Sequence, residues 1–189
     1  ISCSLVGSEM CIRDSEIKRM DMSILKIILI GILCLAPEKD GWVRINGDNY
    51  ISFSFPSRGE RFKKEVNNMR SWIFQTKNIT CVFGAVCTQL TKEKGVLDEY
   101  TINQLYISMK KESVSMPTAK LTGEKRIPDV DMDIREISYT IMKDGEEMTY
   151  FKRFIFRDNC MYQLTIGGKT EDLEELESQR DKFFNSVKF

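Results

Sequence analysis

The side chains available for catalysis or metal binding do not include histidine, which is absent from all 189 positions of the sequence. Its absence removes histidine general-base catalysis, Ser-His and Cys-His nucleophile pairs, and histidine-ligated metals. An enzyme built from this sequence would therefore rely on carboxylates, for instance a hydrolase with two Asp or Glu residues flanking a cleft. The acidic residues show no distinguishing spacing, so no catalytic, cofactor-binding or metal-binding residue is assigned and no cofactor is expected.

Three cysteines, Cys81, Cys87 and Cys160, follow the N-terminal region, and none forms a CxxC pair. On one strand, a spacing of six residues separates Cys81 and Cys87 by roughly 20 Å, too far for a disulfide. Cys160 could reach either of them if its strand were a neighbour. Buried thiols are expected, and a disulfide with Cys160 stays open.

Three further motifs have an ordinary structural explanation. Residues 129–133 (DVDMD) open like a calcium loop, but position six is Ile134 and position twelve is Thr140, whereas the loop requires glycine and a bidentate glutamate. A solvated acidic loop is the better interpretation. Residues 78–80 (NIT) form a glycosylation sequon that matters only in a cell that glycosylates. The cations among residues 152–157, namely Lys152, Arg153 and Arg157, indicate a partly exposed strand more than an anion site.

The first 36 residues do not resemble a folded domain. Residues 4–15 (SLVGSEMCIRDS) resemble a translated sequencing adapter, so residues 1–19 are excluded from the fold and the start is expected at Met20 or Met22. Residues 20–36 then have a positive Lys26 and an apolar run of the length typical of a signal peptide. Alternatives are a buried N-terminal strand or helix, or a lipoprotein lipidated at Cys34. Export followed by a single domain over residues 37–189 is the prediction.

The charge of the chain excludes two classes of partner. Lysine plus arginine and aspartate plus glutamate both number 28, and removing the residues before Pro37 deletes four of each sign. No bulk attraction to nucleic acid, or to a membrane for the mature form unless it is lipidated, is therefore expected. A protein partner or small ligand remains, and its identity is unknown.

Residues 133–189 give the clearest structural pattern, a three-stranded meander followed by an amphipathic helix. Asp144-Gly145 is a strong hairpin signal because both residues tolerate the positive φ of a type I′ turn. A second reversal is expected at Asp158-Asn159, and Gly167-Gly168 is expected to end the third strand. Thr170 is placed to cap the last helix. The helix would bury a stripe on the sheet, formed by Leu173, Leu176, Phe183, Phe184 and Val187. On the strand after the first turn, Met148, Tyr150, Phe154 and Phe156 share a face on which Lys152 is the exception.

The preceding part of the chain is rich in strands. Expected strands are residues 42–48, 50–55, 71–75, 79–90 and 119–126, and the expected helix is residues 97–111, with an apolar stripe of Ile102, Leu105, Tyr106 and Met109. Residues 79–90 are apolar on both faces, which indicates a central strand. This order predicts an α+β fold in which helices pack on an antiparallel β-sheet.

From Trp42 to Phe189 the chain resembles the PsbP-like family. The resemblance rests on YISFSFP (residues 50–56), MYQLTIGG (161–168) and DKFFNSVKF (181–189). It implies an α-β-α sandwich with a short N-terminal hairpin and a binding or assembly role, and it places no functional residue. We therefore expect an exported, periplasmic or extracellular, non-catalytic module of unknown partner. The alternatives are a carboxylate-dependent hydrolase and an envelope lipoprotein.

Overall fold

The computed structural model describes residues 41–47, 50–66, 69–90 and 97–189. The chain divides into two units, Ile1–Cys34 and Leu35–Phe189, and every described residue belongs to the second. The predicted adapter segment, signal peptide and lipidation site at Cys34 therefore lie outside the described residues and stay predictions.

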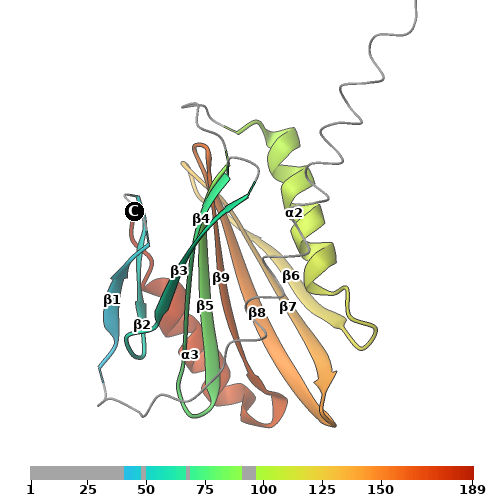
Figure 1. Ribbon diagram of the computed structural model, residues 1–189. Coiled ribbons are helices and arrows are strands. Elements are labelled where there is room, and N and C mark those ends of the chain that lie inside the picture. Colours follow the sequence, from blue (N-terminus) through green and yellow to red (C-terminus); the bar gives the residue numbers. More distant parts are fainter. Residues whose placement is uncertain (1–40, 48–49, 67–68, 91–96) are drawn as a thin grey trace, which may run out of the picture. The chain divides into compact units, whose positions relative to one another are not determined.

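A seven-stranded antiparallel sheet forms the centre of the fold, in the order β3-β4-β5-β9-β8-β7-β6 (Figure 1). Its strands are β3 (Glu60–Val66), β4 (Met69–Lys77), β5 (Cys81–Gln89), β6 (Lys120–Ile127), β7 (Asp133–Lys143), β8 (Glu146–Arg157) and β9 (Cys160–Lys169). A separate hairpin joins β1 (Val43–Asn46) to β2 (Ser52–Phe55). The helical elements are α2 (Glu99–Ser113), the single turn η1 (Thr170–Asp172) and α3 (Leu173–Asn185). This is the predicted α+β fold.

Successive side chains of each strand point to opposite faces, so the sheet divides the apolar residues into two cores. On β8, Phe151 and Ile155 belong to the core that contains Leu176 of α3. Tyr150 and Phe154, whose side chains point to the opposite face of β8, belong to the core that contains Leu105 of α2. The two helices therefore cover opposite faces, as expected for an α-β-α sandwich.

The core beneath α3 is built from aromatic rings. The side chain of Phe183 is fully buried, and its ring centroid lies 5.4 Å from that of Phe55, 5.6 Å from Phe83 and 6.2 Å from Phe53. Phe53 and Phe55 come from β2, so the small hairpin closes this face together with the helix. The prediction that the phenylalanines of the last helix lie on the sheet is confirmed, whereas Leu173 is exposed.

The opposite core forms under α2, which begins where Asp98 accepts a hydrogen bond from the Thr101 amide at 2.6 Å. Leu105 and Tyr106 of the predicted stripe are buried, and Ile102 and Met109 pack partly against the same cluster. A carboxylate cap of this kind satisfies a helix N–H that would otherwise lack a partner. The helix predicted over residues 97–111 is thus confirmed, displaced by two residues.

Both predicted reversals in the meander are present. Asp144 and Gly145 have φ values of 53° and 85°, as a type I′ turn requires, and Asp158 has a φ of 52°. The hairpins place β7, β8 and β9 side by side in the order that the sequence predicted.

Two expectations at the end of the meander were wrong. Gly167 and Gly168 lie inside β9 and do not end it. Glycine is needed at both positions, because a Cβ on Gly167 would approach the Tyr150 ring to 2.3 Å and one on Gly168 would approach the Thr80 carbonyl oxygen to 2.8 Å. These glycines permit close packing of neighbours. Thr170 does not cap the last helix. It begins η1, and its hydroxyl shares a 2.8 Å hydrogen bond with Thr149.

Strand β3 was not predicted, because five of its seven residues are charged and it shows little apolar alternation. Pairing with β4 alone holds it at the edge of the sheet. Among the described residues, no helix is long and apolar enough to cross a bilayer.

Candidate functional site

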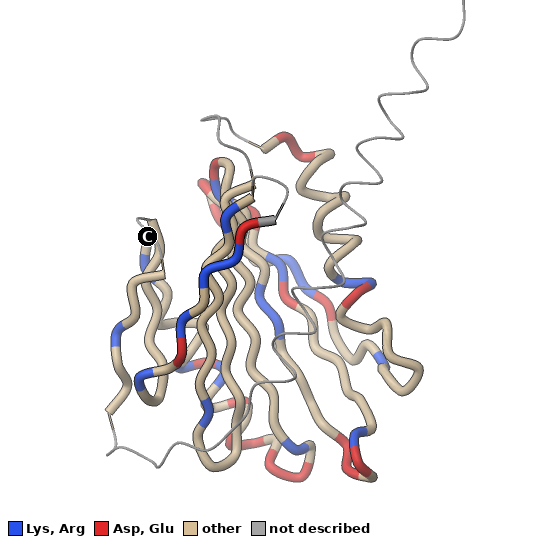
Figure 2. The backbone as a smooth tube through the Cα atoms, in the orientation of Figure 1, with Lys and Arg blue, Asp and Glu red and all other residues tan. Residues whose placement is uncertain are grey.

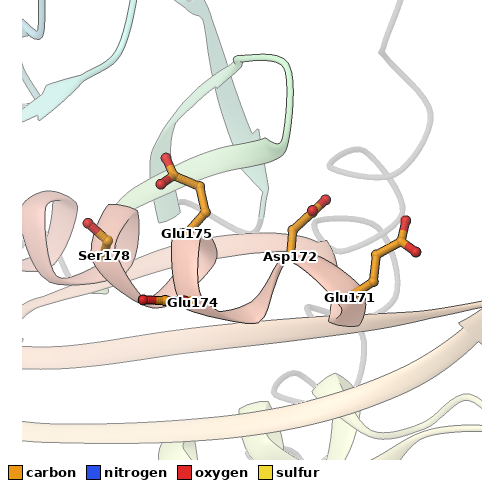
Figure 3. Close-up of a pocket in the computed structure, with 5 residues that line it drawn as sticks. All are labelled: Glu171, Asp172, Glu174, Glu175 and Ser178. Carbon is orange, nitrogen blue, oxygen red and sulfur yellow. The ribbon is translucent and has the colours of Figure 1, made fainter.

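An open depression lies along η1 and the start of α3. It is lined by Glu171, Asp172, Glu174, Glu175 and Ser178. Figure 3 shows these side chains projecting from one helical segment in different directions. Acidic residues in a first helical turn are favoured by the helix dipole, which explains their presence here. They do not face one another across a cleft, as the carboxylates of a hydrolase would.

Two of the three carboxylates of the DVDMD segment, those of Asp129 and Asp133, have partners within the protein. Asp129 accepts hydrogen bonds from the amides of Asp131 and Met132 at 2.9 and 3.1 Å and so closes a turn. Asp133 starts β7 and pairs with Arg126 and Arg135, each at 2.6 Å. Two arginines thus neutralise the carboxylate that a cation would need. Asp129 and Asp131 are exposed, but Asp133 is buried, so the solvated-loop interpretation fails at that residue. Within the described residues, no group of three or more Cys, Asp or Glu is placed to hold a metal ion.

The three described cysteines are buried and form no disulfide. They share the core beneath α3, where Cys160 pairs in register with Gln89 and Cys81 with Gly168. Burial raises the pKa of the Cys81 thiol, and the nearby Glu175 and Asp172 act in the same direction. A raised pKa keeps this thiol protonated and a poor nucleophile.

Asn78 of the sequon has a structural task in the β4–β5 turn. Its side-chain oxygen accepts hydrogen bonds from the amides of Thr80 and Cys81 at 3.1 and 2.7 Å. Asparagine is common at such turns because its side chain can hydrogen-bond to the backbone two or three residues ahead.

The prediction that Lys152 marks a partly exposed strand is wrong. Its side chain is only 3% exposed and lies beneath the C-terminal end of α2. Its ammonium nitrogen donates to Ser113 Oγ at 2.9 Å and lies 5.6 Å from the centre of the Tyr139 ring. Burial lowers the pKa of Lys152 to about 7, and the charge of Glu112 opposes this change. The Ser113 hydroxyl donates to the Met109 carbonyl at 2.8 Å, so its proton is held by the helix and is not directed at a substrate.

Arg153, on the next residue and the opposite face, is also structural. It donates to Glu136 at 2.7 Å and to the Phe184 carbonyl at 2.8 Å, which ties β8 to β7 and to α3. Glu136 also pairs with the exposed Lys125 of β6 at 2.9 Å. Glu136 therefore serves as the acidic partner of both Arg153 and Lys125.

Strand β3 has a different electrostatic environment. The Arg61 guanidinium carbon lies 4.0 Å from the centre of the Trp72 ring, and the Lys63 ammonium lies 5.5 Å from it. Among the described residues, neither cation forms an ion pair. Phe62, between them, points to the other face and is 41% exposed. We call Arg61, Phe62, Lys63 and Trp72 the basic edge.

Charge is unevenly distributed although the chain is neutral overall. Strands β3 and β4 contain five lysines and arginines and two glutamates. The η1–α3 segment contains six acidic and two basic residues. Figure 2 shows these as basic positions along β3 and acidic positions at η1 and at the β7–β8 turn. Such a separation gives the surface distinct regions for partners of opposite charge.

Sequence reasoning missed both unusual lysine environments. Lys152 has the same strand parity as Tyr150 and Phe154, and that parity was a signal of burial. For the basic edge, the signal was the alternation of Arg61 and Lys63 about Phe62, which was not interpreted as a strand.

Comparison with known proteins identifies the fold. No family model matches the chain, and no curated protein sequence matches it. The solution structure of cyanobacterial PsbP (CyanoP) from Synechocystis sp. PCC 6803 superimposes with a TM-score of 0.53 at 10% identity, covering 85% of this chain and 98% of CyanoP. The fold is PsbP-like.

Two further structures are similar at lower scores. One is PA94 from Pseudomonas aeruginosa, described as a protein of unknown function and putative regulator, with a TM-score of 0.44, 12% identity, and coverage of 74% of this chain and 91% of PA94. The other is LpqN of Mycobacterium tuberculosis, described as involved in cell envelope biogenesis, with a TM-score of 0.44, 10% identity, and coverage of 78% and 89%. At these identities the likeness concerns the fold alone.

Proposed function

We propose that this chain is an exported binding or assembly module that acts through its surface on a partner. The observation that carries the proposal is the closure of both sheet faces by elements of the same chain. Leu176 and Phe183 of α3 seal one face, and Leu105 and Tyr106 of α2 seal the other. Side chains at the sheet centre are therefore used in packing, and the charged outer surfaces are what a partner can reach.

The export part of the proposal rests on residues 20–36, whose positive start and apolar run are typical of a signal peptide. It places the mature domain outside the cytoplasm, where a small α+β module can attach to a larger assembly. A tether at Cys34 is compatible with the same role.

Two measurements test this proposal. Expression of the full chain in a bacterial host, with mass spectrometry of the purified product, should give a new N-terminus near Pro37. Cross-linking of the exported chain in the intact envelope should then give a discrete product that excess unlabelled chain suppresses. An unprocessed chain in the cytoplasm would overturn the export, and cross-linking that excess chain does not suppress would overturn the binding role.

A further inference from the structure

The outer side of β3 is an open strand edge in the part of the chain that the structure describes. β3 pairs with β4 along one side, from Glu60 opposite Gln75 to Val66 opposite Met69, and it is the terminal strand of the sheet. No described strand pairs with its other side, so an added strand can hydrogen-bond to the main chain there. Peptides bind many proteins in this way, gaining affinity from the main chain and specificity from alternate side chains.

The side chains of the basic edge fit one kind of added strand. Arg61 and Lys63 lie on one face, beside Trp72, and Phe62 lies on the other. A guanidinium held over an aromatic ring keeps its in-plane N–H groups available for a carboxylate. The complementary strand therefore presents acidic residues at alternate positions on one face and an apolar residue between them.

The ordinary explanation of charges on an edge strand is protection against aggregation. Two observations go beyond it. Phe62 of β3 is 41% exposed, and an exposed aromatic side chain on an edge strand favours association with another chain. On the other edge strand, β6, the neighbouring cations Lys125 and Arg126 are neutralised, because Lys125 pairs with Glu136 and Arg126 with Asp133.

We propose that the basic edge binds an extended acidic segment of a partner protein, which adds to the sheet as a strand beside β3. The inference rests on the proposed function and names the chemistry of the partner. Charge complementarity selects the segment, and main-chain pairing with β3 fixes its direction. A flat anionic membrane fits less well, because the cationic and apolar side chains of one strand point to opposite faces of the sheet.

The probe is a short soluble peptide of alternating glutamate and valine, titrated into the full chain by fluorescence anisotropy. Binding should weaken with added salt, and a lysine–valine peptide should not bind. Two further peptides bear N-methyl groups on every valine or on every glutamate, which removes alternate N–H donors and leaves the charges in place. One methylated peptide should lose binding and the other should retain it, because only one set of N–H groups faces β3. Equal binding by both would refute strand addition.

The variant R61Q/K63Q should bind the probe at least about tenfold more weakly, since two charges are lost from the interface. Its matched control is K120Q/K143Q, which removes two exposed lysines from β6 and β7 and should bind like the parent. Circular dichroism melts verify that both variants fold. Equal affinity of R61Q/K63Q and the control would overturn the proposal.

Two competing occupants are tested with the same proteins. Phosphatidylglycerol vesicles that bind the parent but not R61Q/K63Q would assign the edge to a membrane and overturn the proposal. Sedimentation showing self-association that R61Q/K63Q abolishes would assign it to a second copy and also overturn it. The peptide experiments can overturn binding at the basic edge while saturable cross-linking in the envelope persists in R61Q/K63Q. In that case the module binds its partner by another surface, and the proposed function stands.

Discussion

Replacing Lys152 with methionine should stabilise the domain, by an amount that falls as pH rises. Lys152 is 3% exposed, and its ammonium has a hydroxyl of Ser113 as hydrogen-bond partner without a carboxylate. Methionine has a similar length and keeps the packing under α2, while Ser113 retains its bond to Met109. The substitution therefore removes a buried charge with little loss of contact.

The magnitude follows from the pKa. Burial lowers the pKa of Lys152 from 10.5 to about 7 in the folded protein. Between these values the unfolded chain holds a proton that the folded one lacks, so the free energy of unfolding of the parent rises by about 1.4 kcal/mol per pH unit. Below the folded pKa both states are protonated, and the full cost of the buried charge, of the order of 4–5 kcal/mol, is present. The advantage of K152M should then shrink by about 3 kcal/mol between about pH 7 and about pH 9.5.

Urea melts of parent and K152M at several pH values measure this difference directly. Carboxylates and tyrosines titrate in both proteins, so subtracting the two curves isolates the lysine. K111M, on the exposed side of the same helix, is the control and should differ from the parent by no more than about 1 kcal/mol at any pH. A difference between parent and K152M that does not change with pH would refute the account of Lys152.

Three further results are expected. Phe183→Ala should lower the free energy of unfolding by about 3–5 kcal/mol, and the exposed Glu175→Ala should change it by no more than about 0.5 kcal/mol; equal urea midpoints for the two would remove α3 from the core. Gly167→Ala should lower the thermal midpoint and cost about 1–3 kcal/mol, because the new Cβ would meet a tyrosine ring at 2.3 Å; an unchanged midpoint would contradict that contact. Deleting residues 1–19 should leave the thermal midpoint of the domain unchanged, and a fall of several degrees would show that they belong to the fold.

Local sequence patterns determined much of the fold. Asp144-Gly145 indicates its turn because few residues accept positive φ. Phe183 and Phe184 lie on the sheet because they continue an apolar helical stripe. The period-two alternation of the strands, the turn residues and the helical stripe together predicted the meander, the last helix and the α+β class.

Features that depend on a neighbour distant in sequence required the tertiary structure. The sequence around Gly167 indicates a strand end, whereas in the structure the ring of Tyr150, in the adjacent strand, occupies the space that a side chain at residue 167 would fill. Lys152 resembled a surface residue until α2 was seen to cover it. Strand β3 exists because β4 pairs with it, and its own side chains give little reason to predict it.

The same division applies to the candidate site. The sequence by itself determined which side chains are available, a neutral total charge and the absence of histidine. Only the tertiary structure decided that Lys125, Arg126 and Arg153 pair with acidic residues. It also decided that Arg61 and Lys63 of β3 lie beside Trp72, with no ion pair to another described residue. Composition is a sum over the chain, whereas the electrostatic potential at a surface depends on which charges the strand order places together.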